Sequence, residues 1–202
     1  MLTRRALLAT AITLASLPVL PIPGMAQTSD PAGMFVDKLL HDLTAIVNSN
    51  GPMAPKQMAL AKIVDRDVDI NDVARFCLGR FWRTATPDQQ RDYTTLFHTV
   101  LMKNITGKVG DYQGVTFTVG RSQQREGATV VSSEVTRPGN PPNKVDWLIS
   151  SSSGGPKIID VIAEGTSLRV TQRSDYASYL SRNNDNVQAL INAMRQQISQ
   201  PG

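Results

Sequence analysis

The chain has 202 residues, of which 41% are hydrophobic and 19% charged, and its formal net charge is +4. Basic and acidic residues are interspersed, so this small positive excess does not indicate a nucleic-acid-binding protein. Cys77 is the sole cysteine. An internal disulfide is therefore excluded, and core packing must hold the fold.

The first 26 residues have the pattern of a cleaved export signal. Paired arginines precede an apolar stretch from Ala6 to Leu20, and small residues lead to a cleavage site after Ala26. The apolar stretch is too short and too interrupted by proline for a good membrane span. We therefore expect residues 1–26 to be removed and residues 27–202 to form one domain in the periplasm. The arginine pair also fits the twin-arginine export route, and the choice of route stays open.

Apolar residues at three- and four-residue steps predict helices in the first half of this domain. The expected helices span residues 31–49, 56–66, 71–82 and 86–109. Thr86, Pro87 and Gln89 form a strong helix start with a capping box. Cys77 lies within the apolar stripe of the third helix, which favours a core residue over a reactive thiol.

After the fourth predicted helix, apolar residues alternate with polar ones instead of recurring at three- and four-residue steps. Residues 114–120, 128–137, 144–150 and 157–163 read as strands, and the short turns between them predict an antiparallel meander. The last strand is expected to bend at Glu164-Gly165 and resume through Leu168-Arg169-Val170. Two helices, at residues 173–182 and 186–199, should close the chain. The fold class is therefore α+β: a single domain with an antiparallel, curved sheet of four to five strands packed on several helices.

Catalytic and metal-binding patterns are lacking in this sequence. The two histidines, His41 and His98, are isolated, so no zinc or iron ligand set forms at a recognisable spacing. There is no phosphate-binding glycine loop and no nucleophile elbow. Asp160 is better explained by an ion pair with a nearby arginine, Arg169 or Arg173, than by acid–base catalysis. We expect neither an enzyme nor a metal or other cofactor.

Two separated motifs resemble those of one protein family. The stretch "ARFCLGRFWRTATPDQQRDYTTLF" (74–97) contains an apolar-Leu-Gly-aromatic-Trp-Arg motif followed by a Thr-Pro helix start. The second motif has Asp160-Val161, Glu164-Gly165, Ser167-Leu168 and Arg173-Ser174. Both are similar to the signatures of the MlaC family, also called the toluene-tolerance family, and the resemblance covers roughly residues 30–198. One departure is Pro156-Lys157, where the family usually has an aromatic residue before the lysine.

This resemblance implies a soluble periplasmic phospholipid carrier without enzymatic activity. Such a carrier exchanges a glycerophospholipid between an outer-membrane lipoprotein complex and an inner-membrane ABC transporter complex of the Mla system. The acyl chains would lie in an apolar cavity between sheet and helices, and the headgroup would remain in solvent. A relative associated with hopanoid lipids has similar motifs, so the class of lipid stays open.

Eight apolar residues are our candidates for the wall of that cavity. They are Phe97, Leu101, Phe117, Val131, Trp147, Ile149, Val161 and Leu168. Filled and hollow cores use the same residue types, so each of the eight could instead be an ordinary core residue. Two other readings also remain: an enzyme with an apolar pocket on a similar α+β fold, and a periplasmic adaptor with a filled core.

Overall fold

The chain folds in the predicted order of helices, strands and helices. The structure is a computed structural model that describes residues 30–151 and 154–200, so the expected signal at residues 1–26 lies outside the described residues. The helices are α1 (Pro31–Asn48), α2 (Met53–Asp67), α3 (Ile70–Leu78), α4 (Pro87–Thr106), α5 (Leu168–Arg182) and α6 (Val187–Ser199), with 3₁₀ helices η1 (Gly79–Arg83) and η2 (Val109–Tyr112). The strands are β1 (Thr116–Arg125), β2 (Ala128–Thr136), β3 (Asn143–Ser150), β4 (Lys157–Ala163) and β5 (Thr166–Ser167).

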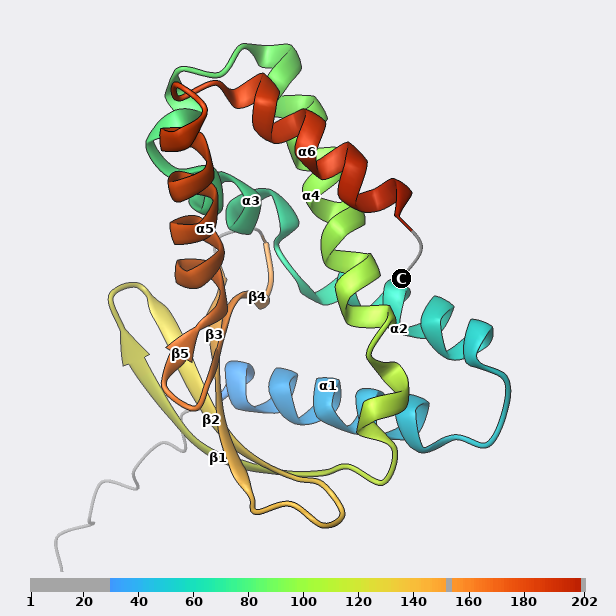
Figure 1. Cartoon of the computed structure of the whole chain (residues 1–202). Helices are drawn as coiled ribbons and strands as arrows, with labels where there is room; N and C mark the ends of the chain where they lie inside the picture. Colours follow the sequence, from blue (N-terminus) through green and yellow to red (C-terminus); the bar gives the residue numbers. More distant parts are fainter. Residues whose placement is uncertain (1–29, 152–153, 201–202) are drawn as a thin grey trace, which may run out of the picture.

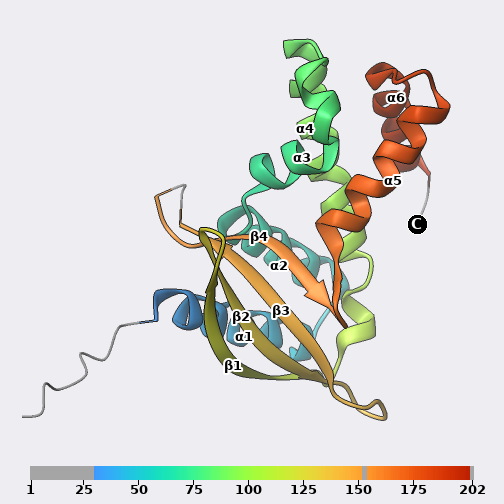
Figure 2. The same cartoon turned by 90° about the vertical axis from the view of Figure 1, so that its left-hand side faces the viewer.

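The five strands form one antiparallel sheet in the order β1-β2-β3-β4-β5, which confirms the predicted meander and the α+β class (Figure 2). The first strand is longer than expected because it continues through the polar residues to Arg125. Its register against β2 shifts between Val119 and Ser122, where a β-bulge interrupts the pairing. The strand forms one edge of the sheet.

Two large apolar clusters build the core. The first, here called the sheet cluster, joins α1 and α2 to one face of the sheet; its buried members are Ala32, Val36, Leu39, Leu40, Ile63, Val131, Trp147, Ile149 and Ile158. The second, here called the helical cluster, joins α3, η1, α4, α5 and α6; its buried members are Ala74, Cys77, Leu78, Phe81, Ala85, Tyr93, Phe97, Val100, Tyr176, Leu180, Val187, Leu190, Ile191 and Met194. Figure 1 shows the corresponding arrangement, with α1 lying along the sheet and α3, α5 and α6 grouped at the opposite end of the molecule.

The predicted core role of Cys77 is confirmed. The residue is 1% exposed within the helical cluster, and its Sγ atom lies 3.5 Å from the carbonyl oxygen of Arg169. Burial raises the pKa of the Cys77 thiol to about 12, so the reactive thiolate is scarce at neutral pH. Phe81 and Trp82 also pack in this cluster.

The prediction of a strand through Leu168-Arg169-Val170 is wrong. Glu164 and Gly165 both have positive φ, of 51° and 79°, and form a two-residue turn that pairs β4 with the very short β5. Helix α5 then begins at Leu168, because the Ser167 side chain accepts a hydrogen bond of 3.1 Å from the backbone N–H of Val170.

The start of α5 is held on β4 by the buried side chain of Asp160. This carboxylate accepts hydrogen bonds from Ser167 Oγ at 2.6 Å and from the backbone N–H of Arg169 at 3.1 Å. The Arg169 guanidinium lies 3.5 Å from Asp160 and stacks 4.2 Å from the ring centroid of Phe76 on α3. The predicted ion pair with Arg169 is therefore present, and it links β4, α3 and α5.

A glycine and an arginine of the two sequence motifs meet in the structure. Gly79, which ends α3, has a φ of +59°, a conformation that side chains disfavour. A Cβ atom at this position would lie 3.0 Å from Nε of Arg173. The Arg173 guanidinium lies 5.0 Å from the ring centroid of Phe76. The Leu-Gly motif is thus explained by close packing of α3 against α5.

We predict that Asp160→Asn lowers the free energy of unfolding by about 2–4 kcal/mol, since it removes the buried charge that these donors and Arg169 surround. Urea unfolding at neutral pH measures the change. The matched control is Asp175→Asn, which changes an exposed carboxylate on α5 and should change stability by less than about 0.5 kcal/mol. A similarly small change for Asp160→Asn would contradict the role of this carboxylate.

Candidate ligand-binding site

One face of the sheet presents a row of apolar side chains toward α1. Val131 pairs with Trp147 across β2 and β3, and Trp147 pairs with Val161 across β3 and β4, so the three side chains lie on the same face. Val131 and Trp147 are buried, whereas Val161 is half-buried and packs at the margin of the sheet cluster.

A buried hydroxyl fixes the orientation of the tryptophan. The indole Nε1–H of Trp147 donates to Ser133 Oγ at 2.9 Å, and that hydroxyl donates to the carbonyl oxygen of Val145 at 3.0 Å. Ser133 is 3% exposed, so both polar groups are satisfied inside an apolar surrounding. Sequence reasoning missed Ser133. The available signal was that Ser133 alternates along β2 with the candidate Val131.

The helical side of the candidate site belongs to α4. Phe97 is buried in the helical cluster, and Leu101, one turn further along α4, is half-buried against it. Helix α4 packs mainly on α2, α3 and α6, while the sheet packs mainly on α1, and α5 and α3 reach it at β4. Among the described residues, no strand is a main packing partner of α4. We call the junction between the sheet cluster and the helical cluster the seam.

The structure brings five of the eight candidates together and separates the other three. Phe117, Val131, Trp147, Ile149 and Val161 all belong to the sheet cluster or pack on it. Phe97 and Leu101 lie on the helical side of the seam. Leu168 is 53% exposed at the start of α5, outside both clusters. Their role as a cavity wall remains a prediction.

Two open hollows of about 540 Å³ each lie on the surface of the described chain. One lies between α1 and β1, where Phe117 and Val119 share the lining with charged groups such as Asp37 and Lys38. The other lies between α5 and α6. The first is lined only by α1 and β1 and the second only by α5 and α6, so neither lies between the sheet cluster and the helical cluster. The expected apolar cavity therefore also stays a prediction.

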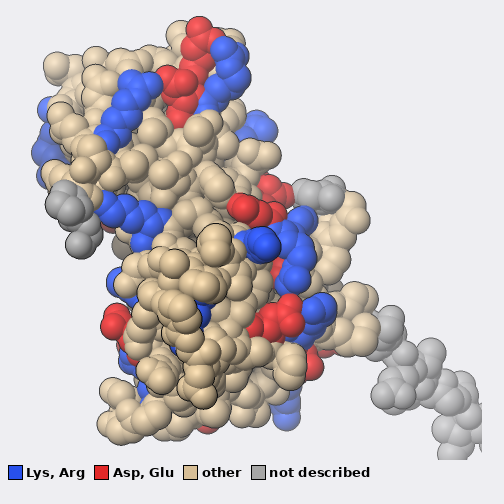
Figure 3. All heavy atoms as spheres, turned by 90° about the vertical axis from the view of Figure 1, so that its right-hand side faces the viewer, with Lys and Arg blue, Asp and Glu red and all other residues tan. Residues whose placement is uncertain are grey.

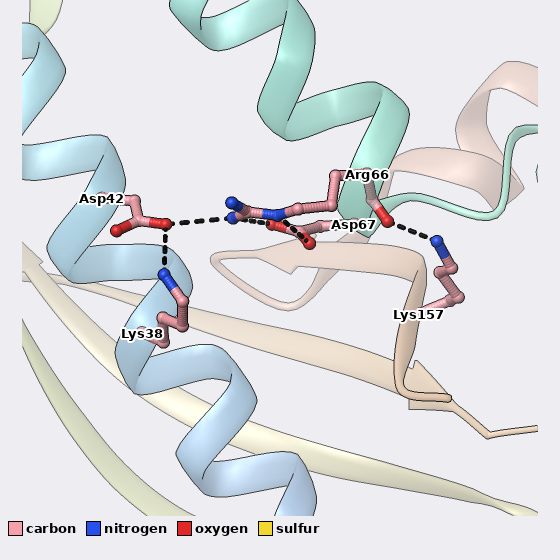
Figure 4. A network of polar contacts seen from close by, with 5 residues as sticks. All are labelled: Lys38, Asp42, Arg66, Asp67 and Lys157. Carbon is pink, nitrogen blue, oxygen red and sulfur yellow. Dashed lines mark hydrogen bonds and ion pairs between the residues drawn. The ribbon is translucent and has the colours of Figure 1, made fainter. Parts of the chain in front are cut away.

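A polar network ties α1, α2 and β4 together (Figure 4). Arg66 makes a two-point contact with the buried Asp67, through Nε at 2.8 Å and Nη2 at 2.7 Å. Its Nη2 also reaches Asp42 on α1 at 3.0 Å, and Lys38 donates to the same carboxylate at 2.9 Å. Lys157 on β4 donates to the carbonyl oxygen of Arg66. The end of α2 is therefore attached both to the middle of α1 and to the start of β4, at one border of the sheet cluster.

Backbone contacts extend this attachment. Val68 forms a parallel bridge with Ile158 on β4, and the N–H of Asp69 donates to the Ile158 carbonyl at 2.9 Å. Since α2 leads directly into α3 here, these contacts join the two clusters at the start of β4. The backbone between α2 and α3 is therefore attached to the start of β4, where the two clusters approach each other.

Among the described residues, few groups are candidates for metal binding or acid–base catalysis. The described residues contain no group of three or more His, Cys, Asp or Glu side chains that could hold a metal ion. His98 Nε2 lies 2.6 Å from Asp65, but both side chains are well exposed, so this pair is not a buried acid–base dyad. No helix within residues 30–151 and 154–200 is long and apolar enough to cross a membrane.

Comparison with known proteins identifies one family and one similar fold. The sequence pattern of the family described as "MlaC protein" matches residues 35–196. Among solved structures, the fold is similar to a phospholipid-binding protein from Ralstonia solanacearum, determined in complex with a phospholipid. The two share 22% sequence identity with a TM-score of 0.74, and the alignment covers 85% of this chain and 100% of that one. At this identity the likeness concerns the fold.

The polar network of Figure 4 predicts that the free energy of unfolding decreases at low pH. Hydrogen bonds from Lys38 and Arg66 hold the pKa of Asp42 below its ordinary value of 3.8. The stability from this group is therefore present above about pH 4 and is lost as the pH falls through the lowered pKa. Asp42→Asn should lower the free energy of unfolding at pH 7 by about 0.5 kcal/mol, and this difference should vanish near pH 2. Urea unfolding at both pH values measures it, with the exposed Asp37→Asn on α1 as control. An equal difference at both pH values would contradict the assignment.

Proposed function

Because the match spans most of its length, this chain belongs to the MlaC family, and we propose that it is a periplasmic carrier of a diacyl glycerophospholipid. The observation that supports this most is the division of the core into a sheet cluster and a helical cluster, each of which has half-buried apolar residues packed against it. The neighbour of similar fold was determined with a phospholipid bound, which agrees with such a cargo.

The physical requirement of such a carrier is to replace water around the acyl chains. Each exposed CH₂ group costs about 0.8 kcal/mol in water, so two acyl chains cost on the order of 20 kcal/mol. Leu101 on the helical cluster and Phe117, Val145 and Val161 on the sheet cluster are only half-buried, so both clusters offer apolar surface suited to acyl chains. We assign the wall to the eight predicted residues except Leu168, whose exposure places it at the outer margin.

The same proposal includes the route of the cargo. The carrier would receive its lipid at one membrane complex of the Mla system and release it at another, the outer-membrane lipoprotein complex and the inner-membrane ABC transporter. No covalent step is required for this exchange, so we propose no enzymatic activity and no cofactor apart from the lipid itself. Export across the inner membrane would be directed by residues 1–26.

A bulky residue at the seam should displace the cargo. Overpacking costs about 1–3 kcal/mol, so Leu101→Trp should lower the lipid-bound fraction of the purified protein about tenfold. Leu168→Trp is the matched control, because it adds the same bulk at an exposed position and should retain the lipid. Native mass spectrometry counts the bound mass, and urea unfolding verifies that both variants fold.

The outcomes of this experiment separate the competing readings. A wild-type protein that carries no lipid would contradict the carrier and favour the adaptor with a filled core. Conversion of added phospholipid into fragments would favour the enzyme. Extraction of a hopanoid in place of a diacyl lipid would keep the carrier but change its cargo. Equal loss of lipid in both tryptophan variants would contradict the placement of the site at the seam.

A further inference from the structure

One end of the molecule exposes large apolar side chains. Met53 and Met58 on the first turns of α2 are 45% and 61% exposed, and Tyr112 on η2, which packs against α2, is 39% exposed. We call these three residues the α2–η2 tip. Methionine and tyrosine side chains suit a boundary between apolar and aqueous surroundings, because they offer apolar area with flexible or amphipathic character.

Cations surround this tip. Lys56 and Lys62 lie on α2, Lys108 precedes η2, and the Arg137 guanidinium lies 5.7 Å from the ring centroid of Tyr112. Within the described part of the chain, none of these four cations takes part in an ion pair. Asp111 is the carboxylate within η2. Figure 3 views the molecule from this side and shows a mainly uncharged area in its lower half, with both basic and acidic side chains toward the margins.

The first turn of α2 adds to the positive character. Its N-cap is Pro52, which offers no side-chain hydrogen bond, and no acidic residue occupies this turn. The free N–H groups of the turn therefore face outward without a side-chain acceptor. They carry the positive end of the helix dipole, which favours nearby anions.

We propose that the α2–η2 tip docks directly on the surface of an anionic lipid bilayer. Apolar side chains flanked by Lys62, Lys108 and Arg137, which form no ion pair with any described residue, match an interface in which acyl chains lie beneath negative headgroups. Lys56 instead donates to the carbonyl oxygen of Val47 at 3.1 Å. The charge complementarity selects anionic lipid over a zwitterionic surface. This inference goes beyond cargo binding, and it holds or fails independently of it.

The tip is connected to the seam through buried residues. Val109 at the start of η2 is 3% exposed, and Val115 just after it is 1% exposed. Val115 forms a third small cluster with Val47 and Val135, on which Phe117 packs. A bilayer-docked tip would thus bring the Phe117 border of the seam close to the membrane surface, where a lipid could pass without crossing a wide layer of water.

The test uses the purified protein and co-sedimentation with vesicles. Vesicles of equal parts phosphatidylcholine and phosphatidylglycerol should bind the wild-type protein, and the binding should weaken as salt is raised. Vesicles of pure phosphatidylcholine should bind it far less. The double variant Met53→Ser with Met58→Ser should lose about tenfold in affinity for the anionic vesicles. Met34→Ser is the control, since Met34 is 62% exposed on α1, away from the tip.

Each outcome decides the proposal. Weak binding to anionic vesicles, or equal loss in the Met34 variant, would overturn it. Binding to an Mla protein complex that is lost in the double variant, without any vesicle binding, would also overturn it in favour of a protein partner. Native mass spectrometry of the double variant should still show bound lipid. Loss of vesicle binding with retained cargo therefore tests the tip, while an empty wild-type protein tests the carrier function.

Discussion

The sheet cluster and the helical cluster share no buried residue, and polar contacts along β4 hold them in one arrangement. At the start of β4, Lys157 donates a hydrogen bond to the end of α2, and Ile158 accepts one from Asp69, which follows that helix. At the middle of the strand, the buried Asp160 holds the start of α5. Hydrogen bonds depend steeply on direction, whereas apolar packing does not. The separation of the clusters is therefore fixed by oriented contacts, and the apolar borders between them need not fuse into a continuous core.

This division of roles agrees with the lipid carrier proposed above, which would have to hold its ligand and release it. Apolar contacts can exchange with acyl chains at little net cost, because both environments exclude water. The directional contacts can stay unchanged while this happens. The row from Val131 to Trp147 is kept in place by the hydroxyl of Ser133, so the floor of the site is ordered even where its margin is only half-buried.

Much of the fold is readable from the sequence, because period and turn chemistry are local. The capping box at Thr86 and the short turns between strands are examples, and both are confirmed. The interpretation failed at Leu168-Arg169-Val170, since three residues alternate equally well in a strand and in the first turn of a helix. Whether Leu101 or Val161 is a packed core residue or lines a cavity depends on the spacing of helices and strands that are far apart in the sequence. No local sequence pattern encodes that spacing. The polar half of β1 was missed because an exposed edge strand carries no apolar alternation.

The free edge of β1 affects how readily copies of the protein associate with one another. Unpaired N–H and C=O groups along β1 could template pairing with another copy, as any long free edge can. The bulge between Val119 and Ser122 and the charges of Arg121 and Arg125 disturb the straight, neutral surface that such stacking needs. These features protect the free edge of the sheet from stacking with the same edge of another copy.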